Sequence, residues 1–144
     1  LAVRKAAGTD AEAEAGALLD LAELLNLRAY ARTYVSRKPR AVAELEEALT
    51  AAVKAKRLAP SPRASRLLGR TLASAAHALL LDVLDAQTRD RLIQEWGGGP
   101  QMFRAADQEL KAAASALQAV DGGAEQALEM GATLAALGEC WFCT

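Results

Sequence analysis

Residues 100–123 read PQMFRAADQELKAAASALQAVDGG, and this stretch decides the fold class. Apolar residues recur in it at alternating spacings of three and four, which is the repeat of one buried face of an α-helix. The repeating positions are Phe103, Ala106, Leu110, Ala113, Leu117 and Val120. Proline is favoured in the first turn of a helix and a glycine pair ends one, so the sequence predicts a helix from Pro100 to about Val120.

Similar apolar repeats fill the rest of the chain between proline and glycine breaks. Thr9 and Glu12 have the spacing of a capping box, and Ser61 followed by Pro62 has the form of an N-cap with proline at the first helical position. These signals predict a first helix at about 9–37, a second that begins at Pro39 and a third that begins at Pro62. A short helix, capped by Asp85 or Thr88, should end before Gly97, and the last helix should span about 124–137.

Each predicted helix should bury one apolar stripe against its neighbours. For the first helix the stripe consists of Ala15, Leu18, Leu21 and Leu25; for the second, of Val42, Leu45, Leu49 and Val53; for the third, of Leu68, Leu72, Ala75, Leu79 and Val83; and for the last, of Leu128, Gly131, Leu134 and Ala135.

Composition points to the same class of fold. The 35 Ala and 23 Leu far outnumber the six Val, one Ile and seven Thr, so helix formers dominate over β-branched residues. A length of 144 residues is typical of one domain, and short glycine and proline connections favour antiparallel neighbours. We therefore expect an all-α protein, one domain over 1–144, folded as an antiparallel bundle of four to five helices. Residues 1–8 are expected to be flexible and 138–144 to form a C-terminal tail.

Charge is segregated along the chain although the net charge is only −1. Residues 28–73 form a basic block with a sum of +8, between acidic flanks. Its basic members are Arg28, Arg32, Arg37, Lys38, Arg40, Lys54, Lys56, Arg57, Arg63, Arg66 and Arg70. Such a block predicts docking on an acidic partner protein or on a layer of lipid headgroups, or else ion pairs within the folded bundle. Nucleic acid is not expected as a partner, because Tyr30 and Tyr34 alone could stack on bases.

One motif of the sequence suggests a specific chemical role, and it is Cys140-Trp141-Phe142-Cys143. A C-x-x-C spacing serves thiol–disulfide exchange or supplies half of a metal site, and here it could equally be a packed aromatic plug that anchors the tail. A structural zinc needs four ligands, and the sole further soft candidate is His77, so no metal is expected. The glycine run 97–99 lacks the ending of a phosphate-binding loop, and no cofactor is expected.

Two further features concern the compartment. The longest apolar run, Ala78–Leu81, is far shorter than the roughly 20 residues of a membrane span, so no transmembrane segment is expected and membrane contact is at most peripheral. The chain opens with Leu1 and has no initiator methionine, which favours an organellar location after presequence removal over a cytoplasmic one.

Together these features predict a non-catalytic accessory subunit that docks on a larger protein assembly, organellar or photosynthetic or respiratory, through the basic block. In architecture such a bundle is similar to the extrinsic lumenal subunits of photosystem II, which are also helical, basic and punctuated by prolines. The alternative is a thiol–disulfide redox protein that uses Cys140 and Cys143. A third reading, a helical adaptor or secreted effector, requires a second copy or a partner helix to cover an exposed apolar face.

Overall fold

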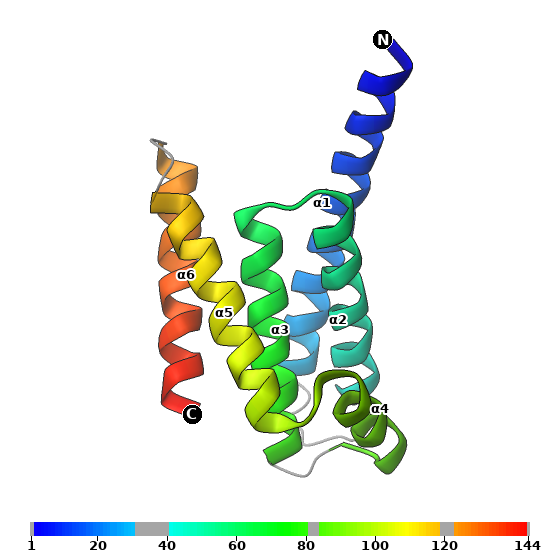
Figure 1. Cartoon of the computed structure of the whole chain (residues 1–144), viewed down its shortest axis with the longest axis vertical. Coiled ribbons are helices and arrows are strands. Elements are labelled where there is room, and N and C mark those ends of the chain that lie inside the picture. Colours follow the sequence, from blue (N-terminus) through cyan, green and yellow to red (C-terminus); the bar gives the residue numbers. More distant parts are fainter. Residues whose placement is uncertain (1, 31–40, 81–83, 119–122, 144) are drawn as a thin grey trace.

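The chain is all-helical over the residues that its computed structural model describes, which are 2–30, 41–80, 84–118 and 123–143. These residues form six helices and no strand: α1 (Ala2–Tyr30), α2 (Ala41–Leu58), α3 (Pro62–Leu80), α4 (Ala86–Trp96), α5 (Gly99–Gln118) and α6 (Ala124–Cys143). The expected fold class is confirmed. Figure 1 shows that the five longer helices alternate in direction along the bundle.

The expected number of four to five helices is too low, because α4 is a complete helix with a cap at each end. At its start the backbone N–H of Thr88 donates to Oδ1 of Asp85 at 2.7 Å. At its end Gly97 adopts a left-handed conformation with φ of 94°, and its N–H donates to the carbonyl of Ile93. Glycine adopts this conformation without steric cost, so α4 ends at Trp96 and α5 begins at Gly99, after two intervening residues.

The Asp85 cap predicts a pH dependence of α4. The hydrogen bonds from Thr88 hold the pKa of Asp85 below its ordinary value. A carboxyl group with a lowered pKa in the folded state stabilises that state above its unfolded pKa, and the stabilisation is lost as pH falls through the folded pKa. The protection factors of the α4 amides, which compare their exchange rates with those of an unfolded chain at the same pH, should therefore fall below about pH 4. Asp85→Asn should keep the cap but remove this pH dependence, whereas equal protection factors at pH 3 and pH 7 in the unmodified chain would contradict the prediction.

The bundle is organised around α3, which packs most extensively on α5 and also contacts α1, α2 and α6. All five described members of the repeat that defines α5, from Phe103 to Leu117, are buried, as predicted; Val120 lies outside the described residues. Leu68, Leu72 and Ala75 of α3 are buried as well. At the crossing of α3 and α5, a Cβ added to Gly69 would lie 2.7 Å from Cγ of Leu110. The core therefore depends on small residues that let helix backbones approach closely.

A buried hydrogen bond links α1 to α3. Nδ2 of Asn26 donates to Oγ1 of Thr71 at 2.7 Å, and the Thr71 hydroxyl donates to the carbonyl of Leu67 at 2.7 Å. Oδ1 of Asn26 has no hydrogen-bond partner among the described atoms. This polar pair lies within an interior made otherwise mostly of alanine and leucine.

Two helix ends differ from the prediction. The first helix begins at Ala2, before the capping box at Thr9, because Ala2–Ala7 contains strong helix formers. Its predicted extension to Arg37 falls within 31–40, outside the described residues. The last helix continues through Gly138 to Cys143, beyond the expected end at Leu137. The left-handed conformation that lets a glycine end a helix occurs at Gly97 and Gly98 among the described glycines, and not at Gly138.

The predicted packing face of the last helix is wrong. Leu128, Gly131, Leu134 and Ala135 are all exposed, whereas Thr133 and Ala136 are buried. The helix is rotated so that Glu129 reaches inward to α3. The same rotation leaves an apolar face on the outside of the bundle.

Candidate interaction surface

The basic block contributes ion pairs between helices. Arg28 contacts Glu44 at 3.7 Å, Lys54 contacts Glu14 at 3.3 Å, and Lys56 pairs with Glu109. Nη2 of Arg63 lies 2.7 Å from Oδ1 of Asp20 and 3.0 Å from Oε2 of Glu23, and Arg66 pairs with Glu129. These contacts link α1 to α2 and α3, α2 to α5, and α3 to α6. Much of the described basic charge is therefore balanced within the chain.

Arg66 is the most deeply placed of these cations. Its side chain is 6% exposed, and its guanidinium donates to both carboxylate oxygens of Glu129, with Nη2 at 3.4 Å from Oε2. Arg63, one turn earlier, is more exposed, and its hydrogen bond to Asp20 raises the pKa of Arg63 above its ordinary value. Both arginines are ion-paired with carboxylates of neighbouring helices, so they hold helices together and are not available to pair with another molecule.

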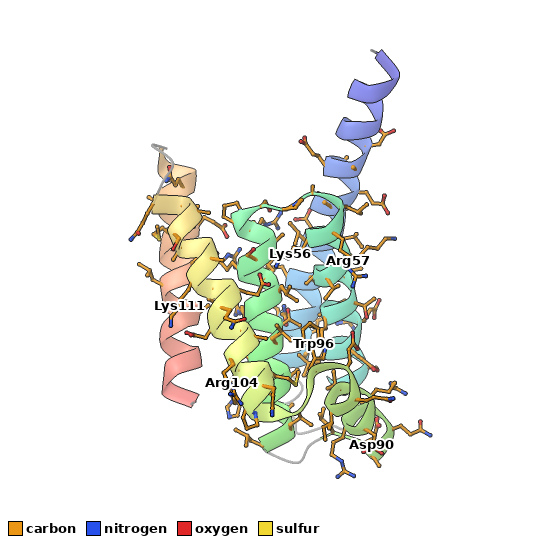
Figure 2. The ribbon with its side chains drawn as sticks, in the orientation of Figure 1. Lys56, Arg57, Asp90, Trp96, Arg104 and Lys111 are labelled. Carbon is orange, nitrogen blue, oxygen red and sulfur yellow. The ribbon has the colours of Figure 1, made fainter. Side chains whose placement is uncertain are left out.

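Two cations of the block have no ion pair with another described residue. Arg57 is exposed near the end of α2, and Arg70 is half-buried on α3. Figure 2 shows Lys56 and Arg57 at the end of the bundle from which α1 projects. Four further basic residues of the block lie outside the described residues: Arg32, Arg37, Lys38 and Arg40. The structure therefore describes only part of the predicted docking surface.

An open groove of about 610 Å³ runs along the exposed side of α2 toward α4. Leu49, Val53 and Leu92 contribute its apolar part. Its charged lining consists of Glu46, Glu47 and Glu95 together with Lys54 and Arg57. Glu46 is already held by Arg91, whose Nε and Nη2 donate to the two carboxylate oxygens at 2.7 and 2.8 Å. The charge of the lining is mixed, and both of its leucines are buried, so the groove exposes little apolar surface to a ligand. It is therefore not a candidate binding site.

The sequence prediction missed an apolar surface on α1. Leu24 and Leu27 are 53% and 55% exposed. Leu21, which was predicted to lie in the buried stripe of this helix, is 39% exposed, so that part of the prediction is wrong. Together with the exposed Ala13 and Ala17 they form what we call the α1 outer face. The signal is present in the sequence, because leucines occur all around this helix and not along one stripe. The first turns of α1 also extend past the ends of α2 and α3 (Figure 1).

A second apolar surface covers the outside of α6. We call it the α6 outer face, and it consists of the exposed residues Ala127, Leu128, Gly131, Ala132, Leu134 and Ala135. Leu128 is 75% exposed and Leu134 is 54% exposed. Between 126 and 136 the one charged residue is Glu129, which pairs with Arg66. Exposed leucines grouped on one uncharged helix face indicate a contact surface.

The C-x-x-C motif lies in the last turn of α6, with its backbone helical from Cys140 to Cys143. The side chains of Cys140, Trp141, Phe142 and Cys143 lie outside the described part, so the redox and anchoring hypotheses both stay predictions. Over the described residues, no group of three or more His, Cys, Asp or Glu side chains is arranged to hold a metal ion.

None of the described helices combines the length and hydropathy that a membrane crossing requires. Comparisons with known proteins yield no protein-family model, no curated protein and no solved structure that matches this chain. The two apolar outer faces and the partly neutralised basic block are therefore the features on which a functional proposal can rest.

Proposed function

We propose that this chain is a non-catalytic accessory subunit that docks on a larger protein assembly. The observation that carries the proposal is the α1 outer face. Leu21, Leu24 and Leu27 recur every three residues and remain exposed, whereas Ala22, Leu25 and Ala29 of the same helix are buried. Helix-in-groove recognition uses apolar anchors at this kind of spacing. An apolar groove on the partner would bury these leucines.

The surroundings of the α1 outer face resemble the polar rim of a protein interface. On one side, ion pairs with Lys54 and Glu44 join its edge to α2. On the other side, Arg63 joins Asp20 and Glu23 to α3. Arg57 adds an exposed cation close by on α2, next to Lys54 in the α2 groove. An acidic group beside the partner's groove would therefore complement Arg57, the cation of this rim that has no ion pair with another described residue.

The proposal can be tested by adding the purified chain to an extract of its source and separating native complexes by size. We expect the chain to migrate with a large complex, and cross-linking mass spectrometry to join Lys54 or Lys56 to an acidic partner. Leu24→Glu should lower the affinity for that complex by about tenfold or more, because it places a charge at the centre of the contact.

Ile93→Glu is the matched control for this experiment. Ile93 is 43% exposed on α4, so the variant adds the same charge at a similarly exposed apolar position outside the α1 outer face. It should bind like the unmodified chain. Migration at the mass of one or two copies in every extract, or equal loss of binding in both variants, would contradict the proposal.

A further inference from the structure

Three arginines of α3 lie on one side of that helix. Arg63, Arg66 and Arg70 follow one another at spacings of three and four residues, which places them within about 60° of one another around the helix axis. Arg63 binds two carboxylates of α1, and Arg66 binds Glu129 of α6. Arg70 is half-buried and has no ion pair with another described residue. Among the described residues, its charge is therefore left without a counter-charge.

The register of α1 and α3 explains why α1 gives Arg70 no carboxylate. These two helices run in the same direction (Figure 1). Arg70 lies seven residues after Arg63 on α3, and seven residues are close to two helical turns. On α1, the residue seven positions after Asp20, the partner of Arg63, is Leu27. The buried amide–hydroxyl hydrogen bond between the two helices joins the sequence neighbours of Leu27 and Arg70, so these two positions lie at the same level.

α6 supplies no carboxylate at this level either. One turn after Glu129, the partner of Arg66, α6 carries Thr133, which is buried and donates its hydroxyl to the carbonyl of Glu129. On α3, Ser74 lies one turn after Arg70 and is half-buried, and its hydroxyl has no hydrogen bond with another described residue. A guanidinium and a hydroxyl therefore lie one turn apart on the same side of α3. Both groups are donors that bind carboxylates.

We propose that the docking partner supplies an aspartate or glutamate carboxylate that binds Arg70 as Asp20 binds Arg63. The inference rests on the proposed docking through the α1 outer face, to which Leu27 belongs. A partner that covers Leu27 also removes water from Arg70 beside it, and a cation that loses water without gaining a counter-charge costs free energy. Because the site is half apolar, it suits a carboxylate carried on a protein surface better than a free inorganic anion.

Arg70→Met tests the inference on the same native complexes that test the docking. The variant keeps most of the apolar length of the side chain and removes its charge. The dissociation constant for the assembly should rise about tenfold or more. The urea midpoint of the free chain should stay unchanged, because no ion pair with another described residue is lost. Arg104→Met is the matched control, since Arg104 is exposed on α5, outside the α1 outer face (Figure 2), and it should bind like the unmodified chain.

Arg70→Lys identifies the carboxylate directly. This variant keeps the positive charge and introduces an amine at position 70. A carbodiimide activates a carboxylate, and an amine in contact with it displaces the activating group and forms an amide, so a cross-link requires direct contact. Mass spectrometry should find an amide between position 70 and an aspartate or glutamate of the partner. Arg104→Lys, treated in the same way, should give no cross-link from position 104 to that partner.

The outcomes separate this inference from the docking itself. Docking that Leu24→Glu abolishes but Arg70→Met leaves unchanged would overturn the carboxylate contact and leave the docking in place. Equal weakening by Arg70→Met and Arg104→Met would show an effect of net charge and overturn the contact as well. So would an Arg70→Lys chain that docks but gives no amide from position 70. A chain that docks on no assembly overturns the docking and this inference together.

Discussion

Arg66→Ala is expected to lower the free energy of unfolding by about 3 kcal/mol. The side chain of Arg66 is 6% exposed and its guanidinium reaches both oxygens of Glu129, whose own side chain is 22% exposed. Removal of one partner of a buried ion pair leaves the other charge partly buried without compensation, and it also removes the packed aliphatic part of the arginine. Urea unfolding measured by circular dichroism gives the difference directly.

Arg63→Ala is the matched control, because it makes the same change one turn earlier on α3. Its partners Asp20 and Glu23 are more exposed and regain hydration, so the loss should be about 1 kcal/mol or less. The double variant Arg66→Met, Glu129→Met should recover much of the loss, since no buried charge remains unpaired. Equal losses for Arg66→Ala and Arg63→Ala would show that burial of the pair has no energetic consequence.

Gly69→Ala is expected to destabilise the fold by about 2 kcal/mol. The added Cβ would lie 2.7 Å from Cγ of Leu110 and 3.1 Å from the carbonyl oxygen of Ala106. Neither atom is the free end of a flexible side chain, so α3 and α5 must separate. This cost exceeds the gain in helix propensity that alanine normally brings. Chemical denaturation again provides the measurement.

Gly16→Ala serves as the control for this prediction. Gly16 lies within α1, and a Cβ there would meet nothing within 4 Å. The same substitution should therefore stabilise the chain by about 0.5 to 1 kcal/mol. Opposite signs at the two glycines would confirm the close approach of α3 and α5, and stabilisation at both would exclude it.

Local signals in the sequence predicted much of the fold. Ser61 caps α3, with the N–H of Ala64 donating to its hydroxyl at 3.1 Å, and Asp85 caps α4. The repeat in α5 is buried through all its described members. Each of these features depends on residues close in the sequence, whose geometry is nearly independent of the remainder of the chain.

The orientation of α6 could not be predicted in this way. Alanine and glycine occur on both sides of this helix, so apolar periodicity favours the side with Leu128 and Leu134, which is the exposed one. In the observed orientation Glu129 pairs with Arg66, which lies 63 residues away in the sequence. A single sequence shows both charges but not their contact. The exposure of Leu128 and Leu134 was for this reason visible only in the folded chain.

The basic block illustrates the same limit for the candidate site. Its sum of +8 over 28–73 is a fact of the sequence, but the carboxylates that balance it come from outside that range. Glu14 and Asp20 precede the block, and Glu109 and Glu129 follow it. Whether a cation is free or paired depends on how the helices are placed in space. A count of charged residues along the chain carries no information about that placement.

The hydrogen bond between Asn26 and Thr71 has a consequence for how the chain selects one native arrangement. Interiors built from repeated alanine and leucine offer several nearly equivalent alignments when one helix slides past another by a turn. Asn26 meets the Thr71 hydroxyl in one of them, and in the others a buried amide would lack its partner. The pair therefore excludes mispaired alignments more than it adds stability. Asn26→Leu should yield a chain that stays helical but populates several slipped packings.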